Sequence, residues 1–175
     1  PPATAGPGLS TFVRRAVRWT GILRPVARVP FLPAFAATAV GFAANNLPGK
    51  VGEVLRPAFL ARSRHLPFSP LLASIVLERV LDGLTRWPDG FEVNPKLERQ
   101  LLARRTAFEK DEIDWALAEA LSFGSLVLEG TPVRLAGQDT RRGTFSQRHG
   151  VLGDQRTEEE FIQLAPLADA QAPFR

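Results

Sequence analysis

The stretch at residues 77–90, LERVLDGLTRWPDG, most constrains what this chain can fold into, because two unlike sequences meet in it. Counting charges in residues 1–85 gives ten Lys and Arg against three Asp and Glu, a net charge of +7. Residues 86–175 carry twelve against fifteen, a net charge of −3. This asymmetry is typical of a basic segment that faces a membrane or nucleic acid and is joined to an ordinary domain. We therefore expect two domains, at residues 1–85 and 86–175.

The composition excludes several kinds of site. The sequence contains no Cys, which excludes disulfides, thiolate metal sites and a cysteine nucleophile. Its two histidines are His65 and His149, so we expect no metal site. No secretory signal pattern is visible. Because the chain has no Met and starts with Pro1, we expect a fragment or a processed product.

The first part of the chain predicts helices without sheet, at residues 10–23, 29–44, 51–62 and 69–84. The first helix is basic and carries Trp19 on its apolar face, as do helices that lie on anionic membranes. A solvated helix of a soluble bundle explains the same pattern equally well. The second is uncharged over residues 29–44, shorter than the roughly 20 residues of a membrane span. A re-entrant half-helix, the end of a tilted span and a buried core helix all remain open.

The second part predicts helices at residues 95–110 and 112–129, with Asn94 and Asp111 as their caps. A short strand at residues 133–136 should follow, and then a cationic, glycine-containing loop that holds Arg148 and His149. Backbone amides and Arg side chains in such a loop can bind an anion. A solvated surface loop is the alternative. The last element expected is a weak one at residues 161–167.

Three short motifs follow one another in the first part: NNLP at residues 45–48, GEVLR at 52–56 and ERVLDG at 78–83. They resemble the flippase-like membrane family that includes the transmembrane region of lysylphosphatidylglycerol synthases. The resemblance implies membrane helices, lipid or lipid-linked substrates and an inner-membrane or membrane-associated location. It assigns the family motif to Asn45, Asn46, Glu53, Arg56, Glu78, Arg79 and Asp82. For residues 1–85 we expect anionic membrane lipid as the partner, and no nucleic acid.

Residues 87–150 contain WPDGFEVNPKLERQLLARR, IDWALAEALSFGSLVLEG and GQDTRRGTFSQRHG. These runs resemble the decarboxylating component of 2-oxoglutarate dehydrogenase, in its actinobacterial multifunctional form. The resemblance implies a cytoplasmic, thiamine diphosphate-dependent oxidoreductase of the tricarboxylic acid cycle with an acyltransferase component as its partner. It further implies that His149 is catalytic and faces 2-oxoglutarate, and that Arg148 and Gln138 bind the substrate. Gly150 departs from a usual Ala, which could loosen the Arg148-His149 pair.

The expected fold is mainly α, with a membrane-type helical segment joined to a partial α/β pyrimidine-domain segment of a thiamine diphosphate enzyme. In the full-length parent the cofactors would be thiamine diphosphate and Mg²⁺. The activating Glu and the Mg²⁺ and diphosphate site fall outside the matching runs, so we expect neither to bind this chain fully, and no turnover. We also expect few contacts across residues 84–87.

Three interpretations stay open. The chain is a fragment of the decarboxylating component, a fragment of a flippase-like integral membrane protein, or a non-functional join in which neither function survives. For the polypeptide itself we rank the join first. As a label, we place the dehydrogenase fragment ahead of the membrane fragment, because its matching runs are the more specific.

Overall fold

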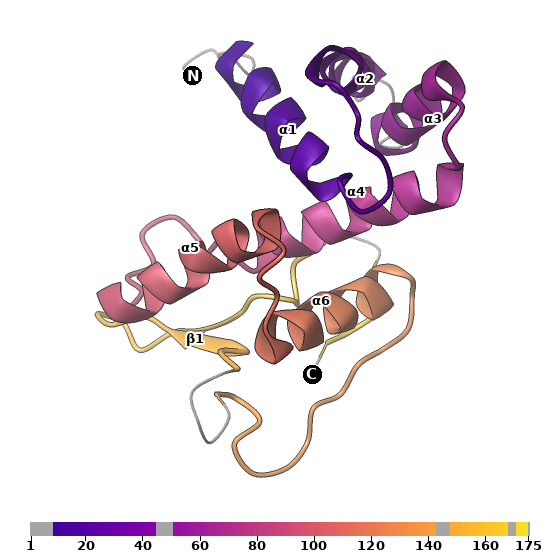
Figure 1. Cartoon of the computed structure of the whole chain (residues 1–175). Helices are drawn as coiled ribbons and strands as arrows, with labels where there is room; N and C mark the ends of the chain where they lie inside the picture. The colour runs from indigo at the N-terminus through magenta and orange to yellow at the C-terminus, as the bar shows by residue number, and fades with distance from the viewer. Residues whose placement is uncertain (1–8, 45–50, 143–147, 168–170, 175) are drawn as a thin grey trace. The chain divides into compact units, whose positions relative to one another are not determined.

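The computed structural model describes residues 9–44, 51–142, 148–167 and 171–174 (Figure 1). These residues form six helices and a two-stranded sheet, which confirms the mainly α expectation. The chain divides into two compact units, which we call unit 1 (Pro1–Ile75) and unit 2 (Val76–Arg175). The boundary therefore falls inside a helix and before the position at which the composition changes.

Unit 1 contains α1 (Leu9–Ile22), α2 (Phe31–Ala44), α3 (Gly52–Arg64) and the first part of α4 (Phe68–Gly83). All four helices lie within two residues of their predicted bounds. Ser10 lies inside α1 and does not cap it. The αL conformation of His65, with φ of 52°, ends α3, and the His65 backbone N–H donates to the Ala61 carbonyl.

Trp19 of α1 lies at the centre of unit 1 and is fully buried. Its indole Nε1 donates a hydrogen bond of 2.9 Å to Ser74 Oγ, which satisfies the polar end of the buried ring. The Arg56 guanidinium lies 3.9 Å from the centre of the ring in a cation–π contact. Arg56 is itself buried. The interpretation of Trp19 as a residue that contacts lipid headgroups is therefore wrong, since this side chain belongs to the core.

Helix α2 is the uncharged segment, and it buries a face of small residues. A Cβ atom at Gly41 would come within 2.9 Å of the Gly52 carbonyl oxygen, so the backbones of α2 and α3 approach closely there. The large apolar side chains of Phe31, Leu32 and Val40 are exposed on the rest of the helix. Within the described residues, no helix combines the length and the apolarity needed to cross a bilayer. The membrane-type character of this part of the chain stays a prediction.

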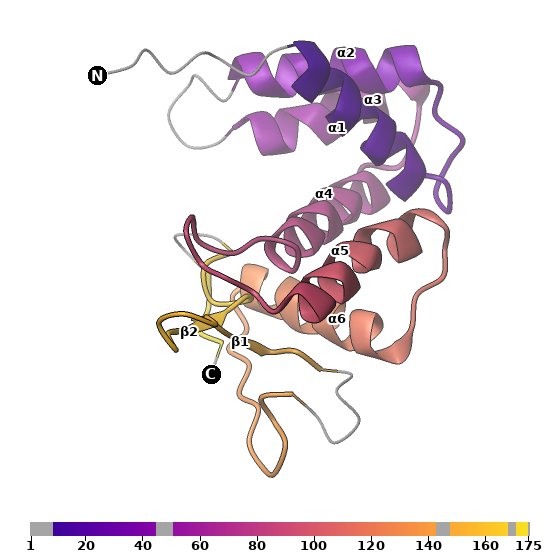
Figure 2. The ribbon, with the colours of Figure 1, turned by 90° about the vertical axis from the view of Figure 1, so that its left-hand side faces the viewer.

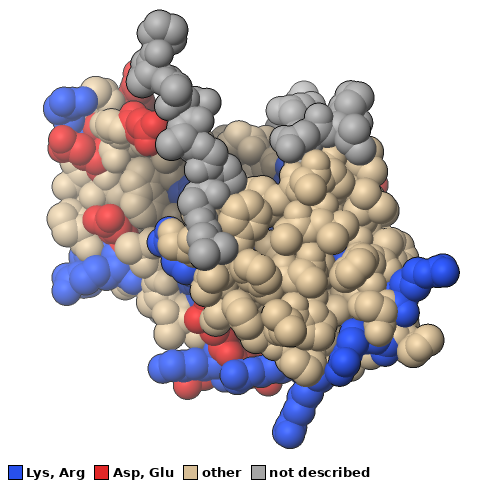
Figure 3. All heavy atoms as spheres, turned by 90° about the horizontal axis from the view of Figure 1, so that it is seen from above, with Lys and Arg blue, Asp and Glu red and all other residues tan. Residues whose placement is uncertain are grey.

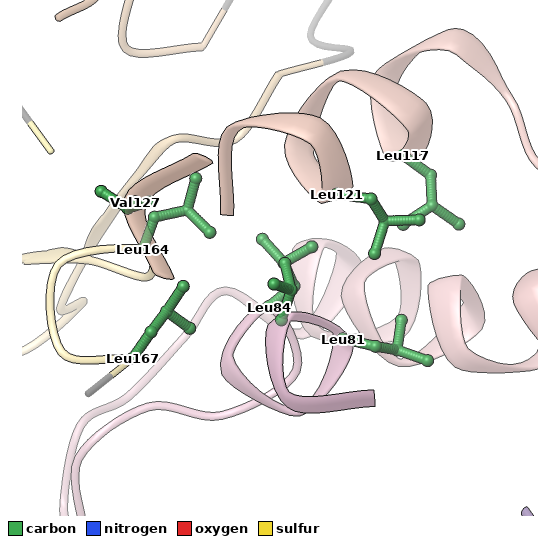
Figure 4. Packing of buried hydrophobic residues seen from close by; sticks show 8 residues of the cluster. Leu81, Leu84, Leu117, Leu121, Val127, Leu164 and Leu167 are labelled. Carbon is green, nitrogen blue, oxygen red and sulfur yellow. The ribbon is translucent and has the colours of Figure 1, made fainter. Parts of the chain in front are cut away.

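Unit 2 contains the end of α4, α5 (Pro95–Glu109), α6 (Trp115–Leu128) and the strands β1 (Val151–Gly153) and β2 (Glu160–Ile162). Figure 2 shows the paired strands and the long connection that precedes them. Leu84 lies between the leucines of α6 and the segment near Leu164, as Figure 4 shows. The main core consists of Val80, Leu81, Leu84, Leu117, Leu121, Val127, Leu164 and Leu167.

The end of α4 is interlocked with the rest of unit 2. A Cβ atom at Gly124 would come within 2.3 Å of Val80 Cγ1, so α4 and α6 touch where Gly124 has no side chain. Gln163 Nε2 donates 2.7 Å to the Leu84 carbonyl, and Arg79 Nε donates 3.1 Å to the Leu167 carbonyl. The expectation of few contacts across residues 84–87 is therefore wrong, because residues on both sides share one core.

Two local expectations in unit 2 also need correction. Asp114 caps α6, because its Oδ1 accepts 2.7 Å from the Leu117 N–H, whereas Asp111 has a φ of 63° and lies before the helix. The strand expected at residues 133–136 is reduced, among the described residues, to one isolated bridge between Val133 and Phe174. The cap at Asn94 is confirmed, with its side chain accepting 3.0 Å from the Lys96 N–H.

Asp154 organises the turn after β1. Its Oδ1 accepts from the N–H groups of Arg156 at 2.7 Å and Thr157 at 2.8 Å, and its Oδ2 accepts 2.8 Å from the Glu92 N–H. These backbone donors, Thr157 first, lower the pKa of Asp154 to about 2. The side chain thereby ties the β1–β2 hairpin to the segment that leads into α5.

The Gly124 contact can be tested by adding one methyl group. We expect Gly124→Ala to destabilise the chain by about 1–3 kcal/mol, because the branched Val80 side chain cannot move away within its helix. In a Val80→Ala background the same substitution should cost nothing or stabilise slightly, since Ala favours helix over Gly. Urea unfolding of the four variants measures the coupling. Strictly additive effects would show that the two residues do not interlock.

The carboxylate of Asp154 should make stability depend on pH. Its folded pKa of about 2 lies below the unfolded value of about 3.9, so its contribution is complete above pH ~5 and lost as pH falls towards 2. Asp154→Asn should lower the urea midpoint at pH 7 and flatten its decline between pH 5 and pH 2. Asp89→Asn, at an exposed turn position, is the matched control. An unchanged acid profile in Asp154→Asn would contradict this role.

Candidate functional site

The cationic loop is held by its own backbone where it returns to β1. The Arg148 N–H donates 2.8 Å to the Arg142 carbonyl, and the Gly150 N–H donates 2.9 Å to the Arg141 carbonyl. Residues 143–147 between them lie outside the described residues. These two hydrogen bonds flank His149 on both sides, so its backbone position is fixed immediately before β1.

The Arg148 side chain is held as well. Its Nε donates 2.6 Å to Glu119 Oε1 and its Nη2 donates 2.9 Å to Glu119 Oε2, which makes the pair bidentate. The hydrogen bond from Arg148 lowers the pKa of Glu119, and the pKa of Arg148 is raised in return. Both groups are charged at neutral pH. Glu119 lies on α6, so a rigid element anchors the loop.

His149 lines a small, partly open cavity of unit 2, together with Arg148 and Glu119. The cavity volume is about 20 Å³, which is room for roughly one water-sized group. Gln163 forms part of its wall, and the Oε1 atom of that side chain is buried without a hydrogen-bond donor among the described residues. The apolar wall consists of Leu84, Ala116, Ala120, Phe123, Leu135, Leu164 and Phe174.

Arg104 of α5 is a second cation in the cavity wall. Burial lowers its pKa and the charge of Asp114 raises it, but the guanidinium remains protonated at neutral pH. Reasoning from the sequence missed both Arg104 and Glu119. One signal was available, because Ala116, Glu119 and Phe123 follow the i, i+3, i+7 spacing of a single face of α6.

The structure brings two of the three predicted loop residues together. Arg148 and His149 both line the cavity, whereas Gln138 is exposed in the turn that follows Gly137 and is not part of the wall. A Cβ atom at Gly150 would lie 3.6 Å from the Arg141 carbonyl oxygen, an ordinary contact distance. The methyl group of an Ala would therefore fit at this position.

The residues of the membrane-family motif are divided between the units. Asn45 and Asn46 lie outside the described residues. In unit 1, Glu53 is in the first turn of α3, and Arg56 is buried against Trp19.

The ERVLDG run lies in unit 2, and its Val80 and Leu81 pack in the core of that unit. Glu78 is buried, and Arg79 donates to the Leu167 carbonyl. Asp82 Oδ1 accepts 2.8 Å from Arg105 Nη2. The two parts of the motif thus fall in different units, and Arg79 and Asp82 contact other residues of unit 2.

The described residues do not fit thiamine diphosphate or its Mg²⁺. Among them, no three Asp, Glu or His side chains form a group that could hold a metal ion. The cavity beside His149 admits about one water-sized group. A larger groove, of about 340 Å³, is lined by Glu92 and Glu98, whose negative charges would repel a diphosphate.

Comparison with known proteins supports both resemblances. Residues 1–86 match the sequence model of the lysylphosphatidylglycerol synthase transmembrane region. The 2-oxoglutarate dehydrogenase E1 component of Bacillus licheniformis is 50% identical over 99 residues, which cover 56% of this chain and 10% of that protein. The corresponding Bacillus pumilus protein is 39% identical over 142 residues, 79% of this chain and 15% of that protein. This chain thus spans only about a tenth to a seventh of these relatives.

The two matches overlap in the sequence. Only 90 of the 175 residues lie after Thr85, so an alignment that covers 56% of the chain must include residues before Arg86. The family match extends to residue 86. Both matches therefore include the end of α4.

Proposed function

We propose that unit 2 is the portion of a 2-oxoglutarate-decarboxylating component that presents His149 to the substrate. The observation that carries the proposal is the position of His149 in a cavity wall, with the cation Arg104 in the same wall. The similarity to 2-oxoglutarate dehydrogenase E1 components supports it. An imidazole titrates near neutral pH, so it can bind a carboxylate or carry a proton beside one.

The size of the cavity limits what this chain does alone. About 20 Å³ cannot enclose a dicarboxylate, so in this proposal further parts of a larger enzyme complete the substrate site. The same parts would hold thiamine diphosphate, whose chemistry is the cleavage of the carboxylate from a 2-oxo acid. The acyltransferase component would be a partner of that larger enzyme. We propose that the 175-residue chain itself binds no cofactor and decarboxylates nothing.

The role of His149 can be tested in an intact relative, at the histidine that matches it. We expect the His→Ala variant of the Bacillus licheniformis protein to lose a factor of about 10²–10⁴ in kcat/KM for 2-oxoglutarate, or roughly 3–5 kcal/mol. Thiamine diphosphate affinity should stay nearly unchanged, because His149 lies in a wall that does not fit the cofactor. Steady-state kinetics and a cofactor titration give the two readouts.

Two results would contradict this proposal. Loss of cofactor binding together with activity would show that the histidine is structural. Decarboxylation of 2-oxoglutarate by the 175-residue chain, with thiamine diphosphate and Mg²⁺ supplied, would show that the chain is active without further parts of a larger enzyme.

A second function, association with anionic lipid, is favoured by the surface of unit 1. Large apolar side chains are exposed on its helices, among them Leu32 at 72%, Val17 at 54% and Val54 at 51%. Exposed apolar side chains such as these would be covered if the helices lay against lipid. Figure 3 shows a face with a wide uncharged area, with Lys and Arg groups and some Asp and Glu groups at its edge. The match to the lysylphosphatidylglycerol synthase transmembrane region supports a lipid partner.

Vesicle flotation of the full chain tests this second function. We expect recovery with anionic vesicles at low salt, less with neutral vesicles, and a decline as salt rises. Replacing the exposed Arg24 and Arg28 by Gln should lower partitioning roughly tenfold or more, at about 1 kcal/mol for each charge. The matched control removes the exposed Arg134 and Arg142 of unit 2. Equal recovery with neutral and anionic vesicles would show that the charge has no such role.

A further inference from the structure

We propose that Glu119 is the positioning residue of this site: it holds Arg148 in a bidentate ion pair and thereby fixes where His149 points. The inference rests on the proposed function of His149 and deepens it. It also changes the role of Arg148, which we assign to anchoring the loop and not to direct substrate binding.

The geometry of the pair carries the first step. Both oxygens of Glu119 accept from Arg148, at 2.6 and 2.9 Å, which is the fork-to-fork arrangement that is among the strongest ion-pair geometries. The side chains are 33% and 25% exposed, so water screens the pair only in part. Glu119 is within the first two turns of α6, where its backbone is rigid.

The second step concerns what the pair restrains. Arg148 and Gly150 are held by their N–H groups on the carbonyls of Arg142 and Arg141. The ion pair adds a side-chain restraint on α6, directly before His149. Since His149 lies between these fixed neighbours, its backbone has little freedom, and its side chain stays in the cavity wall. Loss of the ion pair would free the Arg148 side chain, and with it the restraint on the residue directly before His149.

The third step separates the two cations of the cavity. The charge of Arg148 is taken up by a hydrogen-bonded carboxylate. Arg104 lines the same cavity and makes no hydrogen bond or ion pair within the described part of the chain, although Asp114 acts on it at longer range. Arg104 is therefore the cation better placed to meet a substrate carboxylate.

The same loop offers a matched control. Arg141 forms an ion pair with Glu160, but those side chains are 60% and 56% exposed. Exposed pairs contribute little to stability, typically under about 1 kcal/mol. Glu160→Gln therefore makes the same chemical change as Glu119→Gln, in an ion pair of the same loop, without touching the cavity.

The experiment uses the full 175-residue chain and its Glu119→Gln variant. We expect hydrogen exchange at the amides of Arg148 and Gly150 to quicken about tenfold, which corresponds to ~1.4 kcal/mol. The NMR signals of the His149 ring should move towards those of a mobile imidazole, while those of His65 stay unchanged. Glu160→Gln should change the exchange less than twofold. Arg148→Gln should reproduce the Glu119→Gln result, and Arg148→Lys should restore it only in part, because Lys cannot pair through two donors.

The outcomes separate this inference from the proposed function. Unchanged His149 signals in both Glu119→Gln and Arg148→Gln, with an unchanged urea midpoint, would overturn the positioning role. A changed urea midpoint with unchanged signals would assign the pair to stability alone, which overturns it as well. The kinetic test of the matching histidine in an intact relative is independent. The His→Ala variant of the relative could keep its activity while the His149 signals change in Glu119→Gln. In that case the proposed function is wrong and the positioning role stands.

Discussion

The contact between Val80 of α4 and Gly124 of α6 is the constraint on which unit 2 depends. Since a Cβ atom at Gly124 would lie 2.3 Å from Val80 Cγ1, the two helices can approach only because that side chain is missing. The approach brings Leu81 and Leu84 into the core with the leucines of α6. Helix α6 in turn carries Glu119, which holds Arg148. The packing contact at Gly124 therefore helps to place the helix from which the side chain beside His149 is held.

The helices could be predicted from the sequence because their signals are local. Apolar spacing, the Asn94 cap and the breaks between segments placed all six within a few residues of their bounds. The strands could not be placed in this way. Residues 133–136 have the composition of a strand but meet only Phe174, while β1 and β2 are too short to show a pattern. Pairing depends on which segments the fold brings together, and residues this far apart leave no local signal.

The site could be predicted only in part, because local sequence signals do not show which distant residues the fold brings together. His149 and Arg148 were found through a motif, which keeps neighbouring residues together in the sequence. Glu119 and Arg104 come from two different helices and join the site only through tertiary packing. Trp19 was noticed in the sequence but misinterpreted. A Trp on a basic amphipathic helix has the same local pattern whether it contacts lipid or packs in a core. Its hydrogen bond to Ser74, 55 residues away in the sequence, distinguishes the two.

The end of α4 bears most directly on how the two resemblances meet. The ERVLDG run was interpreted as a membrane-family motif, yet Val80 and Leu81 pack in the core of unit 2 and Asp82 binds Arg105 there. The alignment with the dehydrogenase relatives also has to include residues before Arg86. The fit of Val80 to Gly124 therefore argues that residues 76–84 and the segment after them form one folding unit, and that the change in composition near Trp87 does not mark its start.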